Sequence, residues 1–219
     1  MSEGRYRAEG LQAEFEPGSR SRVLRNRLGI QRVHDMQQAE SDALLAVQEW
    51  AIGHFSAAHR FTADDVALMH RRWLGHIYAW AGDYRQVNIS KSGFMFATAT
   101  QVPRLMADFE AQELTRFTPC AGMDEAGLIM ALARTHGELV LIHPFREGNG
   151  RCARLLASLM AMQAGWPPLD FSLLSGRGRP GYFAAIQAAL GREYVPLQAC
   201  FSRVLARTSR AASAGPAWA

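Results

Sequence analysis

The sequence predicts an all-α protein, a single helical domain interrupted by one short β-hairpin. Apolar residues recur at helical intervals along most of the chain, and only one short stretch alternates polar with apolar residues. The composition, 48% hydrophobic and 20% charged residues, is that of a globular protein. A chain of 219 residues is long enough to bury a core without disulfides or a structural metal.

The chain is expected to begin with an arm. Residues 1–33 have little periodicity, and Pro17-Gly18-Ser19 predicts a turn within them. Because the net charge of +4 is modest, the Arg residues of this arm indicate a solvated surface and no direct contact with nucleic acid. The helical domain is expected over residues 34–207, and its first helix from Asp35 to about Phe55.

The second helix and the hairpin come next. A capping-box pattern at residues 62–65 predicts the start of a helix that runs through Trp80. Residues 86–96 contain the only strand-like stretch, and they predict a hairpin with a four-residue loop at residues 90–93.

The rest of the domain is predicted to be helical. A helix begins near Thr100, and further helices cover residues 124–141, 149–164, 180–190 and 194–207. The segment 124–141 is the most apolar and is expected to be buried nearly all round. Residues 208–219, rich in Ala, Ser and Gly, predict a disordered tail.

Bulk features also exclude several classes of protein. The three cysteines are widely spaced, so neither a disulfide framework nor a zinc ribbon is indicated. No apolar run reaches the length of a membrane span, and the polar first residues do not resemble a secretory signal. We therefore expect a cytoplasmic protein with reduced thiols and no membrane partner.

The loop before the helix at 149–164 reads HPFREGNGRCAR, residues 143–154, and it has the properties of a phosphate site. Gly148 and Gly150 permit backbone conformations that turn successive N–H groups toward one point, and the N-terminus of the helix adds positive potential. Arg151 and Arg154, three residues apart on a helix, share one face and suit a polyphosphate.

Other residues of this motif have expected roles of their own. Asn149 places an amide between the two glycines. Glu147 would repel phosphate unless a cation lay between them, which indicates Mg²⁺ held by one carboxylate and by phosphate oxygens. His143 is the side chain best suited to accept a proton near neutral pH. Phe145 is expected to bury its ring and anchor the loop.

Each of these features alone has a plainer explanation. A Gly-Asn-Gly is often only a turn, a single histidine is often a core residue, and paired arginines on a helix are usually surface charges. Here the fixed choices fall together within residues 143–154, which makes coincidence a poor explanation.

The motif matches HxFx(D/E)GNGRxxR, the signature of the Fic family, at every fixed position, and the resemblance extends over roughly residues 35–205. Residues 77–85, IYAWAGDYR, resemble the upstream block of the family, and residues 88–97 resemble its target-docking hairpin, called the flap. This resemblance implies the Fic (Fido) fold and a protein adenylyltransferase, which transfers AMP from ATP to a hydroxyl side chain of a target protein.

The resemblance also implies roles for single residues. His143 would deprotonate a Tyr, Ser or Thr hydroxyl of the target, and Glu147 would hold Mg²⁺ on the ATP phosphates. The α-phosphate would be stabilised by Gly148, Asn149 and Gly150, and the β- and γ-phosphates would be bound by Arg151 and Arg154.

The flap would pair with the backbone of the target as an added strand. Tyr182 has two interpretations that stay open, as a residue of the adenine pocket or as a core aromatic. The expected flap consists of Lys91, Ser92, Gly93, Phe94, Met95, Phe96 and Ala97.

Many members of the family carry an inhibitory helix with the pattern (S/T)xxxE(G/N). The nearest candidate, Glu9-Gly10, has Arg5 at the position that requires Ser or Thr. The chain therefore resembles stand-alone toxins whose inhibitor is a separate antitoxin with that pattern, as do residues 14–19 and 23–30. Targets in that subclass include the ATPase subunits of type II topoisomerases, DNA gyrase and topoisomerase IV.

Two alternatives remain beside this interpretation. One is an enzyme of the same fold that uses another nucleotide or another phosphate-containing donor. The other is a non-catalytic interaction module that binds a partner through the hairpin. The intact motif favours the transferase over both.

Overall fold

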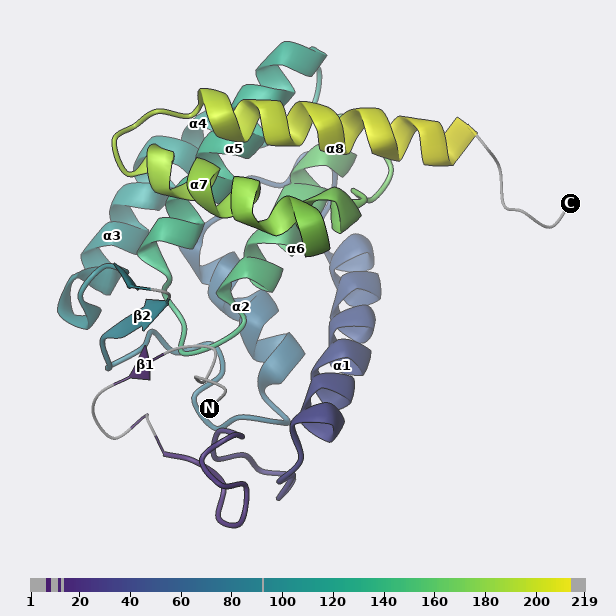
Figure 1. Cartoon of the computed structure of the whole chain (residues 1–219). Helices are drawn as coiled ribbons and strands as arrows, with labels where there is room; N and C mark the ends of the chain where they lie inside the picture. Colours follow the sequence, from purple (N-terminus) through teal and green to yellow (C-terminus); the bar gives the residue numbers. More distant parts are fainter. Residues whose placement is uncertain (1–6, 9–11, 13, 92, 214–219) are drawn as a thin grey trace, which may run out of the picture. The chain divides into compact units, whose positions relative to one another are not determined.

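Helices form most of the chain, as predicted, and the remaining regular structure is one small sheet (Figure 1). The structure is a computed structural model that describes residues 7–8, 12, 14–91 and 93–213. The larger helices are α1 (Val33–His54), α2 (Ala63–Leu74), α3 (Val102–Phe109), α5 (Glu125–Ile142), α6 (Asn149–Gln163), α7 (Arg179–Ala189) and α8 (Val195–Ser213), and short helical segments lie at η2 (Ala99–Gln101), η3 (Glu110–Leu114), α4 (Thr115–Phe117), η4 (Phe171–Leu174) and η5 (Gly176–Gly178).

The chain divides into two compact units, each of them discontinuous in sequence. The first unit contains α1, α2, the sheet and the loop before α6, and the second contains α5, α7 and α8. The first consists of Met1–His54, Ala63–Asp108 and Ile142–Cys152, and the second of Phe55–Thr62, Phe109–Leu141 and Ala153–Ala219.

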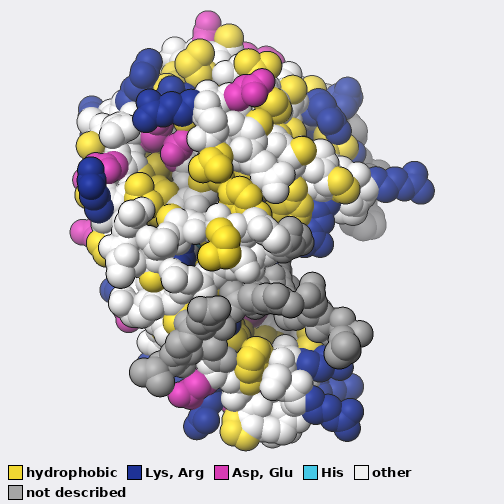
Figure 2. All heavy atoms as spheres, turned by 60° about the vertical axis from the view of Figure 1, so that its left-hand side comes forward, with side chains coloured by type: hydrophobic (Ala, Val, Ile, Leu, Met, Phe, Trp, Pro, Cys, Tyr) yellow, Lys and Arg dark blue, Asp and Glu magenta, His cyan; other side chains and the backbone are white. Residues whose placement is uncertain are grey.

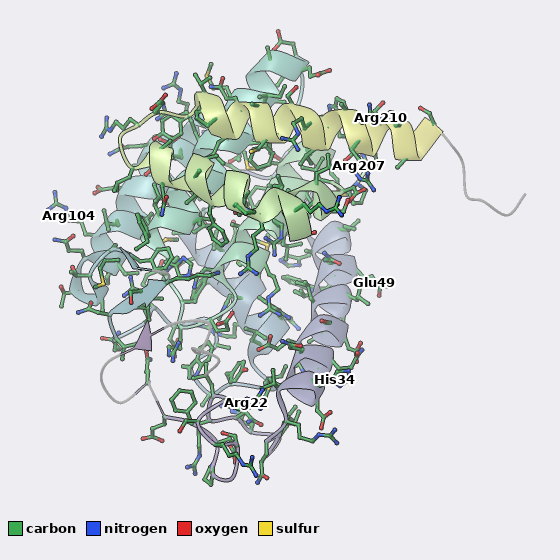
Figure 3. All side chains as sticks on the ribbon, viewed as in Figure 1. Arg22, His34, Glu49, Arg104, Arg207 and Arg210 are labelled. Atoms are coloured by element: carbon green, nitrogen blue, oxygen red, sulfur yellow. The ribbon has the colours of Figure 1, made fainter. Side chains whose placement is uncertain are left out.

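In the first unit, α1 packs beside α2 (Figure 1). The buried side of α1 carries Met36, Glu40, Val47 and Ala51, which follow one another at helical spacing. On the opposite side His34 and Glu49 point away from α2 (Figure 3). One carboxylate, that of Glu40, therefore lies among the apolar side chains that join the two helices.

The second helix is shorter than its pattern predicts. The chain turns after Leu74, where the N–H groups of Ile77 and Tyr78 both bond to the Leu74 carbonyl oxygen. Gly75, a poor helix former, stands at this break. The prediction of a helix through Trp80 is thus wrong beyond Leu74, although Ile77 and Tyr78 are buried.

The hairpin is present with a different register. Strands β2 (Ile89–Lys91) and β3 (Phe94–Met95) are antiparallel, and Lys91 pairs with Phe94. The connection is therefore residues 92–93, two residues rather than the predicted four, with Gly93 at φ +80°. A third strand, β1 (Arg7–Ala8), pairs with the other edge of β2, so the sheet order is β1-β2-β3.

In the second unit, α7 and α8 lie side by side (Figure 1). Helix α8 continues to Ser213, beyond the start of the tail predicted from residue 208, and residues 214–219 lie outside the described part. The continuation is stabilised because Thr208 is buried and donates to the Val204 carbonyl oxygen at 2.9 Å. Arg207 of the same helix contacts Asp170 at 2.5 Å, while Arg210 points outward (Figure 3).

The surface charges and the cysteine thiols are two further features of the fold. Lys and Arg side chains form separate groups on the face drawn in Figure 2. Within the described residues no helix has the length and apolarity needed to cross a bilayer. The three cysteines are buried and free, and burial raises the pKa of the Cys120 and Cys152 thiols to about 12, so both are unreactive at neutral pH.

Candidate functional site

The loop 143–148 is held through its carbonyl oxygens. Arg85 donates from Nε to the His143 oxygen at 2.7 Å and from its main-chain N–H to the Pro144 oxygen at 2.8 Å. His143 itself has φ +53°, a left-handed conformation that costs free energy in a residue other than glycine. The backbone of His143, the predicted general base, is therefore held by Arg85, a residue outside the motif.

A buried histidine holds the next part of the loop. His70 of α2 accepts a hydrogen bond at Nδ1 from the Gly82 N–H at 2.9 Å, so its proton lies on Nε2. That Nε2–H donates to the Glu147 carbonyl oxygen at 3.0 Å. The imidazole also stacks on Phe145, with ring centroids 3.8 Å apart. The function of His70 as a support of the motif has no local sequence signal.

Phe145 and Asn149 close the loop on itself. The Phe145 ring is fully buried, which is the arrangement expected of a loop anchor. Asn149 accepts from the Phe145 N–H through Oδ1 at 2.8 Å and donates to the Phe145 carbonyl oxygen through Nδ2 at 2.7 Å. The amide expected to face a phosphate is thus bonded to the loop, and Asn149 presents its main-chain N–H instead.

The start of α6 has the form of an anion site. Gly148 lies at φ +85°, and its carbonyl oxygen accepts from the N–H groups of Arg151 and Cys152 at 2.9 Å each. The first N–H groups of a helix have no partner within the helix, and the helix dipole adds positive potential at the same point. Gly148 and Gly150 therefore lie where backbone donors can bind a phosphate.

Glu147 contributes one buried carboxylate beside this helix start. Its Oε1 accepts from the Gly148 N–H at 3.0 Å and lies 3.5 Å from Nη2 of Arg151. Among the residues that the structure describes, no three His, Cys, Asp or Glu side chains gather as a metal cluster. One carboxylate fits Mg²⁺ that takes most of its ligands from phosphate and water, but it does not fit a metal bound entirely by protein.

Arg151 has a partner that the motif does not contain. Its Nη2 lies 2.7 Å from Oε2 of Glu40, and its guanidinium stacks over the Trp73 ring at 4.5 Å. The Nε atom is buried and has no hydrogen-bond partner within the described residues. The guanidinium is thus paired with the Glu40 carboxylate and keeps one N–H donor, on Nε, that has no partner in the described part of the chain.

Glu40 is itself held rigidly. Its Oε1 accepts from the Tyr78 hydroxyl at 2.8 Å, and its main-chain oxygen accepts from Nε1 of Trp73 at 2.8 Å. Burial and the Glu40 carboxylate raise the pKa of Tyr78 far above its ordinary value, so the hydroxyl stays a donor. Glu40 is not among the site residues that the sequence predicts, although it is the one acidic residue in the buried stripe of α1.

The remaining predicted residues lie in the second unit. Arg154 follows Arg151 three residues later along α6. Burial and then the charge of Arg154 lower the pKa of His136 to about 3. Tyr182 is 6% exposed, and its hydroxyl lies 2.7 Å from Nε2 of His136. Tyr182 is thus buried in the second unit with its hydroxyl bonded, and an adenine contact stays a prediction.

The hairpin lies against the predicted base. The Phe96 ring stacks on the His143 imidazole with centroids 3.7 Å apart and planes 20° from parallel. Met95 at the other side of the hairpin is 62% exposed, and Ser92 lies outside the described residues. In the first unit the structure thus brings together His143, Glu147, the glycines, Arg151 and the hairpin residues around Phe96.

The state of His70 leads to a pH prediction. Burial lowers its pKa from 6.5 to about 3, so protonation favours the unfolded chain. The contribution to stability is complete above pH 6.5 and is lost as the pH falls toward 3, at about 1.4 kcal/mol per pH unit. We expect the urea-unfolding free energy of His70→Asn to decline less steeply between pH 6.5 and 5 than that of wild type. The exposed His76→Asn is the control, and equal slopes for wild type and His70→Asn would contradict the assignment.

Comparison with known sequences agrees with this geometry. The sequence pattern of the Fic/DOC family matches residues 60–161, which include the hairpin and the motif. Protein adenylyltransferase VbhT of Bartonella schoenbuchensis is 33% identical over 144 residues, which is 66% of this chain and 30% of that protein. Protein adenylyltransferase Fic of Nematostella vectensis is 32% identical over 151 residues, 67% of this chain and 33% of that protein. The chain thus spans about a third of the length of these relatives.

Solved structures share the fold. The BepC protein of Bartonella tribocorum, solved with bound AMPPNP, has a TM-score of 0.67 at 20% sequence identity, covering 83% of this chain and 91% of that one. Fic-1 (residues 134–508) of C. elegans has a TM-score of 0.59 at 26% identity, covering 80% of this chain and 50% of that one. The likeness to BepC shows the fold alone.

Proposed function

Residues 60–161 form a domain of the Fic/DOC family, and on that premise we propose that the protein is a protein adenylyltransferase. In this function it transfers AMP from ATP to a hydroxyl side chain of a target protein. The observation that carries the proposal is the intact motif 143–154, in which His143 lies against Phe96 of the hairpin and the two glycines flank the start of α6. Relatives named protein adenylyltransferase support the same activity.

The proposed reaction is an in-line displacement at the α-phosphate. The target hydroxyl oxygen forms a bond to the α-phosphorus, the bond from that phosphorus to the bridging oxygen breaks, and pyrophosphate leaves. His143 accepts the hydroxyl proton as the nucleophile attacks. The N–H groups at the start of α6 stabilise the charge that develops on the α-phosphate oxygens, because they are fixed in place before the reaction.

The remaining phosphates need positive charge. Arg151 and Arg154 are proposed to bind the β- and γ-phosphates, with Nε of Arg151 as one donor not used elsewhere in the described chain. Glu147 would hold Mg²⁺, and the ion would neutralise phosphate charge when bound. The buried position of Glu147 and its bond from the Gly148 N–H keep its carboxylate oriented for that purpose.

The biological setting is also a proposal. The resemblance of residues 14–19 and 23–30 to stand-alone toxins supports control by a separate antitoxin that supplies an (S/T)xxxE(G/N) helix. We propose that the protein is the toxin of such a pair, that it acts in the cytoplasm, and that its targets are ATPase subunits of type II topoisomerases. Addition of an antitoxin helix with this pattern should then suppress the transfer.

Two labels of ATP test the activity directly. The protein is incubated with Mg²⁺, purified gyrase or topoisomerase IV subunits, and ATP labelled at the α- or at the γ-phosphate. Label retained on protein from α-labelled ATP alone is the expected result, and EDTA should abolish it. Label from γ-labelled ATP would indicate phosphate transfer, and no label from either would contradict the proposed function.

Glu40→Gln is expected to weaken the fold and to strengthen ATP binding. The substitution removes the carboxylate that neutralises Arg151, and breaking a buried ion pair costs about 3 kcal/mol. Without the Glu40 carboxylate the positive charge of Arg151 is less neutralised, so it attracts phosphate more strongly. We expect a lower Tm without nucleotide, and a larger rise in Tm on adding Mg-ATP than wild type shows.

Glu113→Gln provides the matched control for that experiment. Glu113 is also buried and lies 2.6 Å from an arginine, Arg134, but both residues are in the second unit and outside the motif. It should lose stability without any gain in the response to ATP. If Glu40→Gln responds to ATP as Glu113→Gln does, Glu40 has no influence on phosphate binding by Arg151.

A further inference from the structure

Arg85 is the most buried charged residue near the motif. It lies between the turn after α2 and the start of the hairpin, and only 1% of its surface is exposed. In the described part of the chain, its side-chain partners are all main-chain carbonyl oxygens. Burial lowers its pKa to about 10, so it remains a cation at neutral pH. A buried cation without a carboxylate is costly, which indicates a specific use.

The guanidinium joins the two strand ends of the hairpin to the motif loop. Nη1 donates to the Val87 oxygen at 2.7 Å, just before β2, and Nη2 donates to the Ala97 oxygen, just after β3. Nε donates to the His143 oxygen at 2.7 Å, and Nη2 also lies 3.4 Å from the Ile142 oxygen. One planar group thus contacts the entrance of the hairpin, its exit and the backbone of the predicted base.

A second contact shows what this connection positions. Phe96, next to Ala97, stacks on the His143 imidazole at 3.7 Å. The Phe96 N–H also donates to the Ile89 oxygen at 3.3 Å, which ties this residue to β2. A shift of the hairpin would therefore move a ring that lies directly on the imidazole.

We propose that Arg85 is a positioning residue for the transfer reaction, which fixes the target-docking hairpin at a set distance from His143. This inference rests on the proposed function. A target strand that binds to the hairpin then always lies at the same distance from the His143 imidazole. The hydroxyl of the target can therefore reach the base. A misplacement of about 1 Å can cost about 10²-fold in rate.

The geometry explains why arginine is required. The guanidinium carries N–H donors on three separate nitrogen atoms in one rigid plane, and each of the three main contacts uses a different nitrogen. Lysine carries its donors on a single nitrogen and cannot span the same oxygens. Arg85→Lys therefore preserves the charge while it removes the connection.

Arg85→Lys tests the proposal when it is compared with Arg134→Lys. Arg134 also makes a two-nitrogen contact, to Glu113 at 2.6 and 2.9 Å, but it lies in the second unit. For Arg85→Lys we expect kcat/KM for the protein target to fall about 10²-fold, while the Kd for Mg-ATP changes less than about twofold. Amide hydrogen exchange of residues 89–96 should accelerate about tenfold or more. The control should change neither.

Two results would overturn the proposal. One is unchanged hairpin exchange in Arg85→Lys, and the other is a loss of ATP affinity equal to the loss of target transfer. If Arg85→Lys does not fold, the proposal is tested instead by native-state amide hydrogen exchange of the wild-type protein in low denaturant. The amides of the hairpin and those of the motif loop should then exchange through one opening reaction with the same free energy. Different opening free energies would contradict the proposed connection through Arg85. Because exchange needs no activity, it separates a failure of this inference from a failure of the proposed function.

Discussion

Replacing His143 with alanine is expected to lower the rate of AMP transfer by about 10²- to 10⁴-fold, the usual contribution of a general base. Affinity for Mg-ATP should stay within about twofold, because the proposed phosphate site consists of the start of α6 and Arg151. The measurement is the initial rate with α-labelled ATP and a purified target, together with nucleotide affinity from calorimetry. A rate defect with intact binding is the signature of a residue that acts on the nucleophile.

The control for this experiment is a histidine of the same unit. His76 is exposed and lies in the turns after α2, so His76→Ala should transfer AMP at the wild-type rate. The outcome that would contradict the role of His143 is full activity in His143→Ala. Loss of ATP binding equal to the loss of rate would indicate instead that the stacked Phe96 and the loop have collapsed.

Gly148→Ala is expected to have the largest effect on stability. Gly148 lies at φ +85°, which L-residues adopt only with strain of about 1–3 kcal/mol. A Cβ atom there would lie 2.6 Å from Cζ3 of Trp73. That ring cannot move easily, because it is buried, donates to the Glu40 oxygen and lies under the Arg151 guanidinium. The overpacking adds about 1–3 kcal/mol, and Tm should fall by about 10 °C.

Gly165→Ala separates strain from packing. Gly165 has nearly the same φ, +84°, but no atom lies within 4 Å of the position of its Cβ. The control should therefore lose only the strain contribution, with a fall in Tm of about 3 °C. Differential scanning calorimetry of both variants measures the difference, and equal shifts would exclude the contact with Trp73 as a cause.

The features that sequence predicted well are those encoded locally. The helices at 33–54, 125–142 and 149–163 follow from apolar spacing and from the residues at their ends. The motif that we propose to bind phosphate is contained within twelve consecutive residues, where the glycines and the helix start determine the backbone. In these segments the backbone conformation depends on residues that are close together in sequence, so the sequence alone predicts it.

The supports of the motif could not be predicted in the same way. Glu40, His70 and Arg85 reach it from positions 58 to 111 residues earlier in the chain, the separations of the contacts Arg85–His143 and Glu40–Arg151. The position of Glu40 in the buried stripe of α1 indicates burial, but the partner of a buried polar residue depends on how the helices pack. The hairpin register was missed for a related reason, since the positive φ of Gly93, and not the alternation of side chains, determines the two-residue turn.

The contacts of Arg85 have a consequence for how such an enzyme can change during evolution. Because the guanidinium binds only main-chain oxygens of Val87 and Ala97, substitutions at these positions leave the bonded atoms in place. Under the proposed function, substitution of the exposed Met95 would likewise alter which protein is recognised without changing the main-chain contacts of Arg85. Under the proposed function, target choice and catalytic geometry would thus evolve separately, because new targets could be acquired by point mutations in a hairpin whose attachment does not change.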